Sequence, residues 1–207
     1  MIISWHKAGG ESEVREQVDF DSTFCPALFD VLGVKKGIKS QSAEILRTVF
    51  LTISGVENVV RLQDFGRVCG LLGPINSSFL KRLKAVSKHS WFFGGCSTTQ
   101  AEKILLASGN KTFLVRFSST GHNFTLSYVS GNKIWHSRIK KAEGVDSYEL
   151  EGSNMVFESL EALVNFAVKT KSDVLACAAT GSPFVLSWQK KKNGVGGYRE
   201  FQAEQKK

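Results

Sequence analysis

The sequence predicts an α+β fold in its second half, a central antiparallel sheet flanked by two helices, preceded by an all-helical first half. Two observations support this division. Apolar residues recur every three or four positions over residues 1–89, which is the helical period. From Trp91 onward, short apolar runs separated by turn residues follow one another in the order helix, three strands, helix. Such an order places a sheet against covering helices.

Four apolar patterns predict helices in the first half. Gly33, Gly55 and the Gly73-Pro74 pair separate these patterns, as expected of residues that end helices. The positions that define them are Phe24, Leu28, Phe29 and Leu32; Ala43, Leu46, Val49 and Phe50; Phe65, Val68, Cys69 and Leu72; and Phe79, Leu80, Leu83 and Val86.

The second half begins with a helix through Leu105, for which Ser97 or Thr98 is a suitable N-cap. The Ser130-Gly-Asn132 run is a hairpin signal between two strands. The other predicted elements are strands at 112–118, 123–129 and 133–139, a helix at 158–168 and a final strand at 184–188.

The composition and length are those expected of a globular protein without a membrane span, a secretion signal or a zinc site. The 207 residues have ordinary hydrophobic and charged fractions, and no run of about eighteen apolar residues could span a membrane. The first residues do not resemble a signal peptide, so we expect a cytoplasmic protein, of the producing cell or of a host cell if the chain is an effector. The four cysteines lie far apart without zinc spacing, and we expect buried, reduced thiols, no metal and no cofactor.

The net charge of +8 is unevenly placed. A basic segment at 190–207, which we expect to be a flexible tail, carries half of the excess. A nucleic-acid-binding protein needs a basic stripe on a folded face, so we expect no nucleic-acid partner. Weak contact of Lys190, Lys191 and Lys192 with an anionic membrane is an alternative use of the tail, although three such lysines are usually only solvated.

Arg116 is the residue that points to function. It lies in an apolar strand whose two faces are both expected to be covered, so the guanidinium is drawn into the domain. A buried arginine keeps its charge and needs an anion. The anion is either an internal Asp or Glu or an external phosphate. No acidic residue lies between Thr112 and Ile139, which favours phosphate.

Further donors follow Arg116 in the chain. The hydroxyls and N–H groups of the turn after the strand can surround phosphate oxygens, and two basic residues of the third strand share one face. These candidate phosphate-binding residues are Ser118, Ser119, Thr120, His136 and Arg138.

Residues 90–189 resemble the Src-homology-2 (SH2) family. The segments that carry the resemblance are Trp91-Phe-Phe-Gly94, Ala101-Glu102, Gly109 to Ser118 with Phe-Leu-Val-Arg, Phe124 to Val129, His136-Ser-Arg138, and Phe157 to Leu160 with Leu163-Val164. The resemblance implies a signalling module, an adaptor or effector, that binds tyrosine-phosphorylated peptides or proteins. It implies that Arg116 grips the phosphate, with the other five residues around it.

One departure from the family concerns the start of the first helix. Many members carry Arg or Lys there, and this chain has Thr98, which removes one cationic contact. Arg138 is a residue that could compensate.

The first half resembles the EF-hand-like pair in the Cbl tyrosine-kinase-binding region. The segments that carry this weaker resemblance are Trp5 to Ala8, Val18 to Phe24, and Asn58 through Phe65 to Leu72-Gly-Pro74. If Val60 is the central apolar residue of the loop, Ile53 takes the first ligand position and Asp64 the last. An isoleucine cannot bind calcium, so the resemblance implies a calcium-free structural brace.

Three other functions are alternatives for this sequence: catalysis, self-association and a structural role. The four histidines show no nucleophile–base motif and the sequence has no P-loop, kinase motif or RING array, so we expect no enzyme. Phosphorylated Tyr198 could bind the Arg116 site of its own chain or a neighbour's, giving self-association. A structural interaction domain without phosphate dependence is the other alternative.

Overall fold

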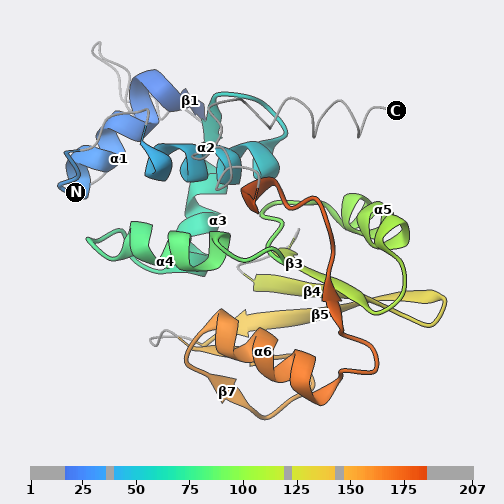
Figure 1. The fold of residues 1–207 in the computed structure, drawn as a ribbon. Helices are drawn as coiled ribbons and strands as arrows, with labels where there is room; N and C mark the ends of the chain where they lie inside the picture. Colours follow the sequence, from blue (N-terminus) through green and yellow to red (C-terminus); the bar gives the residue numbers. More distant parts are fainter. Residues whose placement is uncertain (1–16, 36–39, 119–122, 143–146, 186–207) are drawn as a thin grey trace. The chain divides into compact units, whose positions relative to one another are not determined.

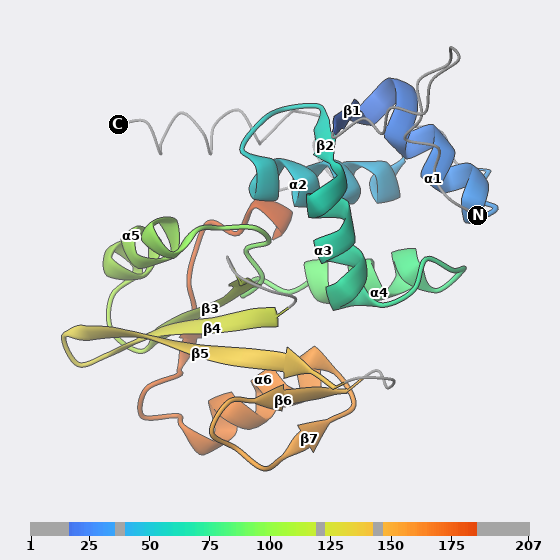
Figure 2. The ribbon, with the colours of Figure 1, turned by 180° about the vertical axis from the view of Figure 1, so that it is seen from behind.

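The computed structural model describes residues 17–35, 40–118, 123–142 and 147–185. Contacts divide the chain into two compact units, Met1–Lys84 and Ala85–Lys207. Figures 1 and 2 show the elements of each unit. No helix within the described ranges is both long and apolar enough to cross a membrane. The tail at 190–207 lies outside the described residues.

The first unit contains the four predicted helical regions. They are η1 (Phe20–Phe24, a π-helix) continuing into α1 (Cys25–Val31), α2 (Gln41–Ser54), α3 (Leu62–Leu72) and α4 (Phe79–Ser87), of which the last ends in the second unit. A short antiparallel sheet is added by β1 (Gln17–Asp19) and β2 (Val59–Arg61), with Val18 opposite Val60. Strands of three residues are too short for periodicity to predict.

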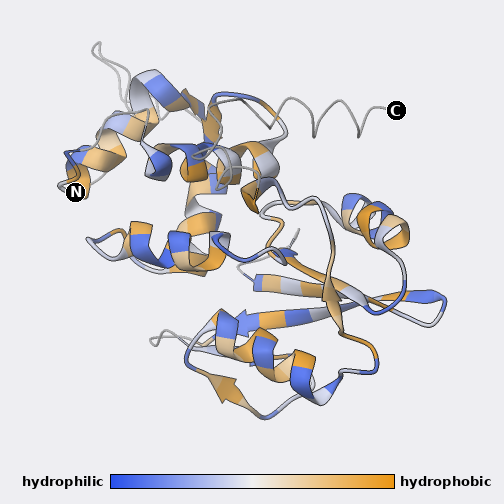
Figure 3. Ribbon diagram, in the orientation of Figure 1, coloured by the Kyte–Doolittle hydropathy of each residue, from blue (hydrophilic) through white to orange (hydrophobic). Residues whose placement is uncertain are grey.

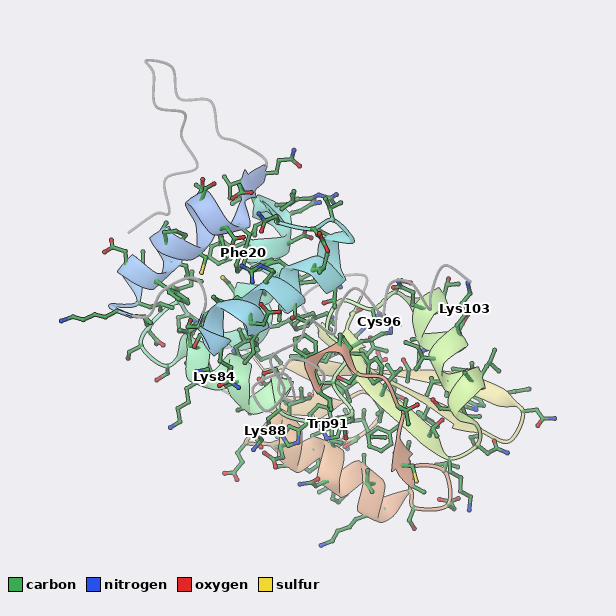
Figure 4. All side chains as sticks on the ribbon, turned by 45° about the horizontal axis from the view of Figure 1, so that its top comes forward. Phe20, Lys84, Lys88, Trp91, Cys96 and Lys103 are labelled. Carbon is green, nitrogen blue, oxygen red and sulfur yellow. The ribbon has the colours of Figure 1, made fainter. Side chains whose placement is uncertain are left out.

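Four phenylalanines pack together within the core of the first unit. The ring of Phe24 lies 4.9 Å from that of Phe50 and 5.1 Å from that of Phe65, both edge-on. Phe20, labelled in Figure 4, packs 5.9 Å from Phe24. The guanidinium of Arg47 lies 4.9 Å above the Phe20 ring. The apolar spacing that predicts the helices therefore also identifies residues of their common core.

The second unit is built on one six-stranded sheet. Its order is β7-β6-β5-β4-β3-β8, antiparallel except for the parallel pair β3–β8. The strands are β3 (Thr112–Phe117), β4 (Asn123–Ser130), β5 (Lys133–Lys141), β6 (Tyr148–Leu150), β7 (Val156–Phe157) and β8 (Cys177–Ala178). The predicted meander forms its centre, and Ser130 pairs with Lys133 across the Gly131-Asn132 turn.

The predicted strand at 184–188 is wrong in its described part. Residues 183–185 are helical, and the last strand lies earlier, at β8. Pro183 cannot donate to a strand ladder, and Phe184 is fully buried with its ring 4.9 Å from that of Phe92. Phe184 thus fills the core, and residues 183–185 do not join the sheet.

Two helices flank the sheet, as predicted. Helix α5 (Thr98–Ser108) packs against β3 and β4, and α6 (Leu160–Thr170) packs against β6 and β7 (Figure 1). Hydrophobic and hydrophilic residues alternate along both helices at the helical period (Figure 3). Ala101 and Leu105 of α5 form a buried cluster with Leu114 of β3. Helix α5 therefore covers the face of β3 that carries Leu114 and Arg116.

The segment before the sheet is tied to α6. His89 stacks on Trp91 at 4.5 Å, and its Nε2 lies 3.3 Å from Glu161 Oε2. Lys88 Nζ lies 3.4 Å from the same carboxylate. Figure 4 shows Lys88 and Trp91 beside α6. Burial lowers the pKa of His89 while Glu161 acts in the opposite direction.

A capping box fixes the start of α5. Ser97 Oγ accepts from the Gln100 N–H at 3.2 Å, and Gln100 Oε1 accepts from the Ser97 N–H at 2.8 Å. We expect Ser97→Ala to lower the free energy of unfolding by about 1 kcal/mol in urea denaturation. Thr99→Ala, which removes an exposed hydroxyl two positions away, is the matched control. Equal effects of the two substitutions would show that the box does not stabilise α5.

The cysteine prediction holds only in part. All four cysteines are free, and Cys25 and Cys96 are buried as expected. Cys177 is exposed and Cys69 is half-buried. Cys177 is exposed because it lies on β8, at the edge of the sheet.

Candidate functional site

Arg116 lies at the centre of the candidate site. All six residues of β3 are buried, as expected of a strand covered on both faces, and Arg116 is only 3% exposed. Its Nη2 donates to Thr98 Oγ1 at 2.9 Å, and its Nη1 lies 3.4 Å from the carbonyl oxygens of Cys96 and Phe117. The start of α5 therefore holds the guanidinium between helix and sheet.

The strand register aligns the other basic residues with Arg116. Arg116 pairs with Thr125 of β4, and Thr125 pairs with Arg138 of β5. Since neighbouring strands are about 4.8 Å apart, Arg116 and Arg138 begin about 10 Å apart on one face. His136 occupies the same face one row away. The structure thus brings three predicted site residues together on the face that α5 covers.

His136 is held from two sides. Its Nδ1 lies 2.9 Å from Ser127 Oγ, and Ser127 is fully buried. Its Nε2 lies 3.4 Å from Glu102 Oε1 of α5. These contacts fix the ring beside the row that contains Arg116.

Arg138 makes an ion pair. Its Nη1 lies 3.6 Å from Glu151 Oε1, and both side chains are about half exposed. The sequence left open an internal Asp or Glu as the partner of Arg116. The structure shows such a carboxylate, Glu151, as the partner of Arg138.

The three hydroxyl residues of the predicted phosphate loop are only partly described. Ser118 is buried, and its N–H donates to the Asn123 carbonyl at 2.8 Å. Ser119 and Thr120 lie outside the described residues.

Cys96 lies beside Arg116, which donates to its carbonyl oxygen and interacts electrostatically with its thiol. Burial raises the pKa of the Cys96 thiol to about 12, although the charge of Arg116 acts against this shift. Figure 4 shows Cys96 near the start of α5. A thiol that stays protonated at neutral pH is a poor nucleophile, so Cys96 contributes its backbone carbonyl and not thiolate chemistry.

The site also contains residues that sequence reasoning missed: Glu102, Thr125, Ser127 and Glu151. Counting back from the Gly131-Asn132 turn would have found Thr125 and Ser127, because a two-residue hairpin fixes the register of the strands. Glu102 and Glu151 come from other elements, and the spacing of the strands does not place them beside His136 and Arg138.

The two positions expected at the ends of the calcium loop lie in helices of the first unit. Ile53 lies in α2, and Asp64 is a buried residue of α3. Burial raises the pKa of Asp64, against the charges of Arg61 and Arg67. Within the ranges that the structure describes, no cluster of three or more His, Cys, Asp or Glu side chains could hold a metal ion.

Comparison with known proteins identifies the domain that carries the site. A family profile described as SH2 domain matches residues 91–166, which include α5, β3, β4, β5 and Arg116. The chain contains an SH2 domain. SH2 domains are phosphotyrosine-binding signalling modules, so the predicted domain class and its binding function are confirmed.

Several curated relatives are kinases. Dual specificity protein kinase shkC of Dictyostelium discoideum is 29% identical over 79% of this chain and 30% of its own length. Tyrosine-protein kinase FRK of Homo sapiens is 35% identical over 55% of this chain and 22% of its own. The chain thus spans less than a third of these relatives.

A solved structure also matches the chain. The solution NMR structure of the Monosiga brevicollis CRK/CRKL homolog (crka1) SH2 domain is 27% identical and covers 45% of this chain and 88% of its own, with a TM-score of 0.40.

Proposed function

We propose that the SH2 domain of this protein binds tyrosine-phosphorylated peptides or proteins with Arg116 as the main phosphate ligand. The observation that carries this proposal is the buried Arg116 guanidinium, aligned with His136 and Arg138 on one sheet face. The residues proposed to complete the site are Ser118, Ser119, Thr120, His136 and Arg138.

The bonds that Arg116 makes in this structure explain why a phosphate is a suitable ligand. Thr98 Oγ1 and the carbonyl of Cys96 are neutral acceptors. Bonds from a guanidinium to an anionic oxygen are roughly twice as strong as those between neutral groups. A phosphate dianion therefore gains more from this fork than the hydroxyl and carbonyl do.

Thr98 affects how the free energy of phosphate binding is divided among the site residues. It supplies a hydroxyl to Arg116 and no cation to the ligand. We infer that Arg116 contributes a larger part of the binding free energy here than in SH2 domains with a basic residue at this position.

The segments on either side of the SH2 domain have supporting roles in this proposal. We propose that residues 1–89 form a calcium-free, EF-hand-like brace and that 190–207 form a basic tail. The pairing of β1 with β2 beside helices α2 and α3 supports the EF-hand likeness. An SH2 domain is a binding module and not a catalyst, so we propose an adaptor or effector in the cytoplasm without activity of its own.

The proposed function is tested by titrating the whole chain with one tyrosine peptide, phosphorylated and unphosphorylated, by isothermal calorimetry. We expect only the phosphorylated peptide to bind measurably. The phosphoserine version should also fail, because its shorter side chain cannot bring the phosphate to a guanidinium that is only 3% exposed. Equal affinity for the phosphorylated and unphosphorylated peptides would contradict the proposal.

A further inference from the structure

The ion pair between Arg138 and Glu151 lies within the proposed phosphate site. Arg138 shares its face and its row of the sheet with Arg116. Glu151 follows β6, the neighbour of β5, and its N–H donates to the Arg138 carbonyl at 2.8 Å. This backbone bond fixes Glu151 beside Arg138, so the 3.6 Å contact between their charged groups joins two anchored residues.

A carboxylate at this position opposes an anionic ligand in two ways. It already pairs with Arg138, the cation that a phosphate would bind. It also places a negative charge near the incoming phosphate dianion. Both side chains reach solvent, at 45% and 48% exposure, so the pair can open without burying a charge. Exposed ion pairs typically contribute little free energy, so a phosphate can displace this contact.

We propose that Glu151 is a built-in competitor for the ligand phosphate, holding Arg138 in the free domain and lowering affinity for phosphotyrosine. This inference rests on the proposed function of the Arg116 site. Glu151 thus acts as an affinity-determining residue that touches Arg138 and not the phosphate. Phosphotyrosine binding then proceeds by exchange of one anion for another at Arg138.

The neighbouring charges provide a matched control. Glu149 of β6 lies opposite Lys140 of β5 and begins on the same face as Glu151, two residues away. Glu149→Gln removes the same charge from the same edge of the sheet without releasing Arg138. A difference between Glu151→Gln and Glu149→Gln therefore reports the specific contact.

The test uses the full chain and N-acetyl phosphotyrosine amide, a probe without flanking residues, in an NMR titration. We expect Glu151→Gln to tighten binding about two- to fivefold, the range of an exposed ion pair, and Glu149→Gln to have a smaller effect. The gain should shrink as salt is raised, because exposed charges are screened. In an Arg138→Gln background, Glu151→Gln should have no further effect.

The outcomes are distinguishable. Unchanged or weaker binding by Glu151→Gln would overturn the competitor role, as would an equal gain from Glu149→Gln or a gain that persists without Arg138. If the unsubstituted chain binds the probe and loses it with Arg116→Ala, any of these results leaves the proposed function standing. If binding does not depend on the phosphate at all, the proposed function and this inference both fail.

Discussion

Replacing Arg116 with alanine should abolish phosphotyrosine binding while leaving the domain folded. The substitution removes the two donors expected to grip the phosphate, each worth about 1.5–3 kcal/mol to an anion. The dissociation constant for a phosphotyrosine peptide should therefore rise by at least about a hundredfold. Calorimetry measures this loss, and a urea unfolding curve shows that the variant still folds.

Arg116→Lys separates charge from geometry. Lysine keeps the positive charge but cannot present a planar fork of donors, so we expect it to recover little of the affinity. Affinity within a few-fold of the unsubstituted chain for Arg116→Ala would show that Arg116 is not the main ligand, and the same result for Arg116→Lys would show that charge alone binds the phosphate.

Phe92→Ala should cause the largest loss of stability in the second unit. The ring is fully buried and lies 5.3 Å from Phe117, 6.4 Å from Phe124 and 4.9 Å from Phe184. Its deletion leaves a cavity among these rings, which should lower the free energy of unfolding by about 3–5 kcal/mol. Urea denaturation followed by tryptophan fluorescence measures the change, because Trp91 is the adjacent residue.

Phe92→Leu is the control for cavity formation. It keeps most of the apolar volume, so its cost should be clearly smaller. A loss below about 1 kcal/mol for Phe92→Ala would mean that the surrounding rings close the space, and that this cluster does not hold the unit together.

Much of the fold follows from local patterns. The helical spacing identifies α2 and α3, the cap at Ser97 identifies the start of α5, and the apolar run around Arg116 identifies a strand buried on both faces. These features are local because propensity, capping and side-chain alternation act within a few residues.

Other features depend on contacts between distant segments. The pairing of β8 with β3 involves two residues of each strand, too few for any periodicity. Glu102 reaches His136 from a separate helix, and Glu151 reaches Arg138 from beyond the next strand. The strands around Arg116 contain no acidic residue, but carboxylates reach the site from segments outside these strands. The strand sequence alone therefore could not identify them.

The most direct measurement is a crystal structure of the chain with N-acetyl phosphotyrosine amide. The proposed function predicts two nitrogens of the Arg116 guanidinium at about 2.7–2.9 Å from two phosphate oxygens. The competitor role predicts that Arg138 has turned from Glu151 toward the ligand. A phosphate bound elsewhere, with Arg116 still donating to Thr98 as it does in the free chain, would contradict the central claim.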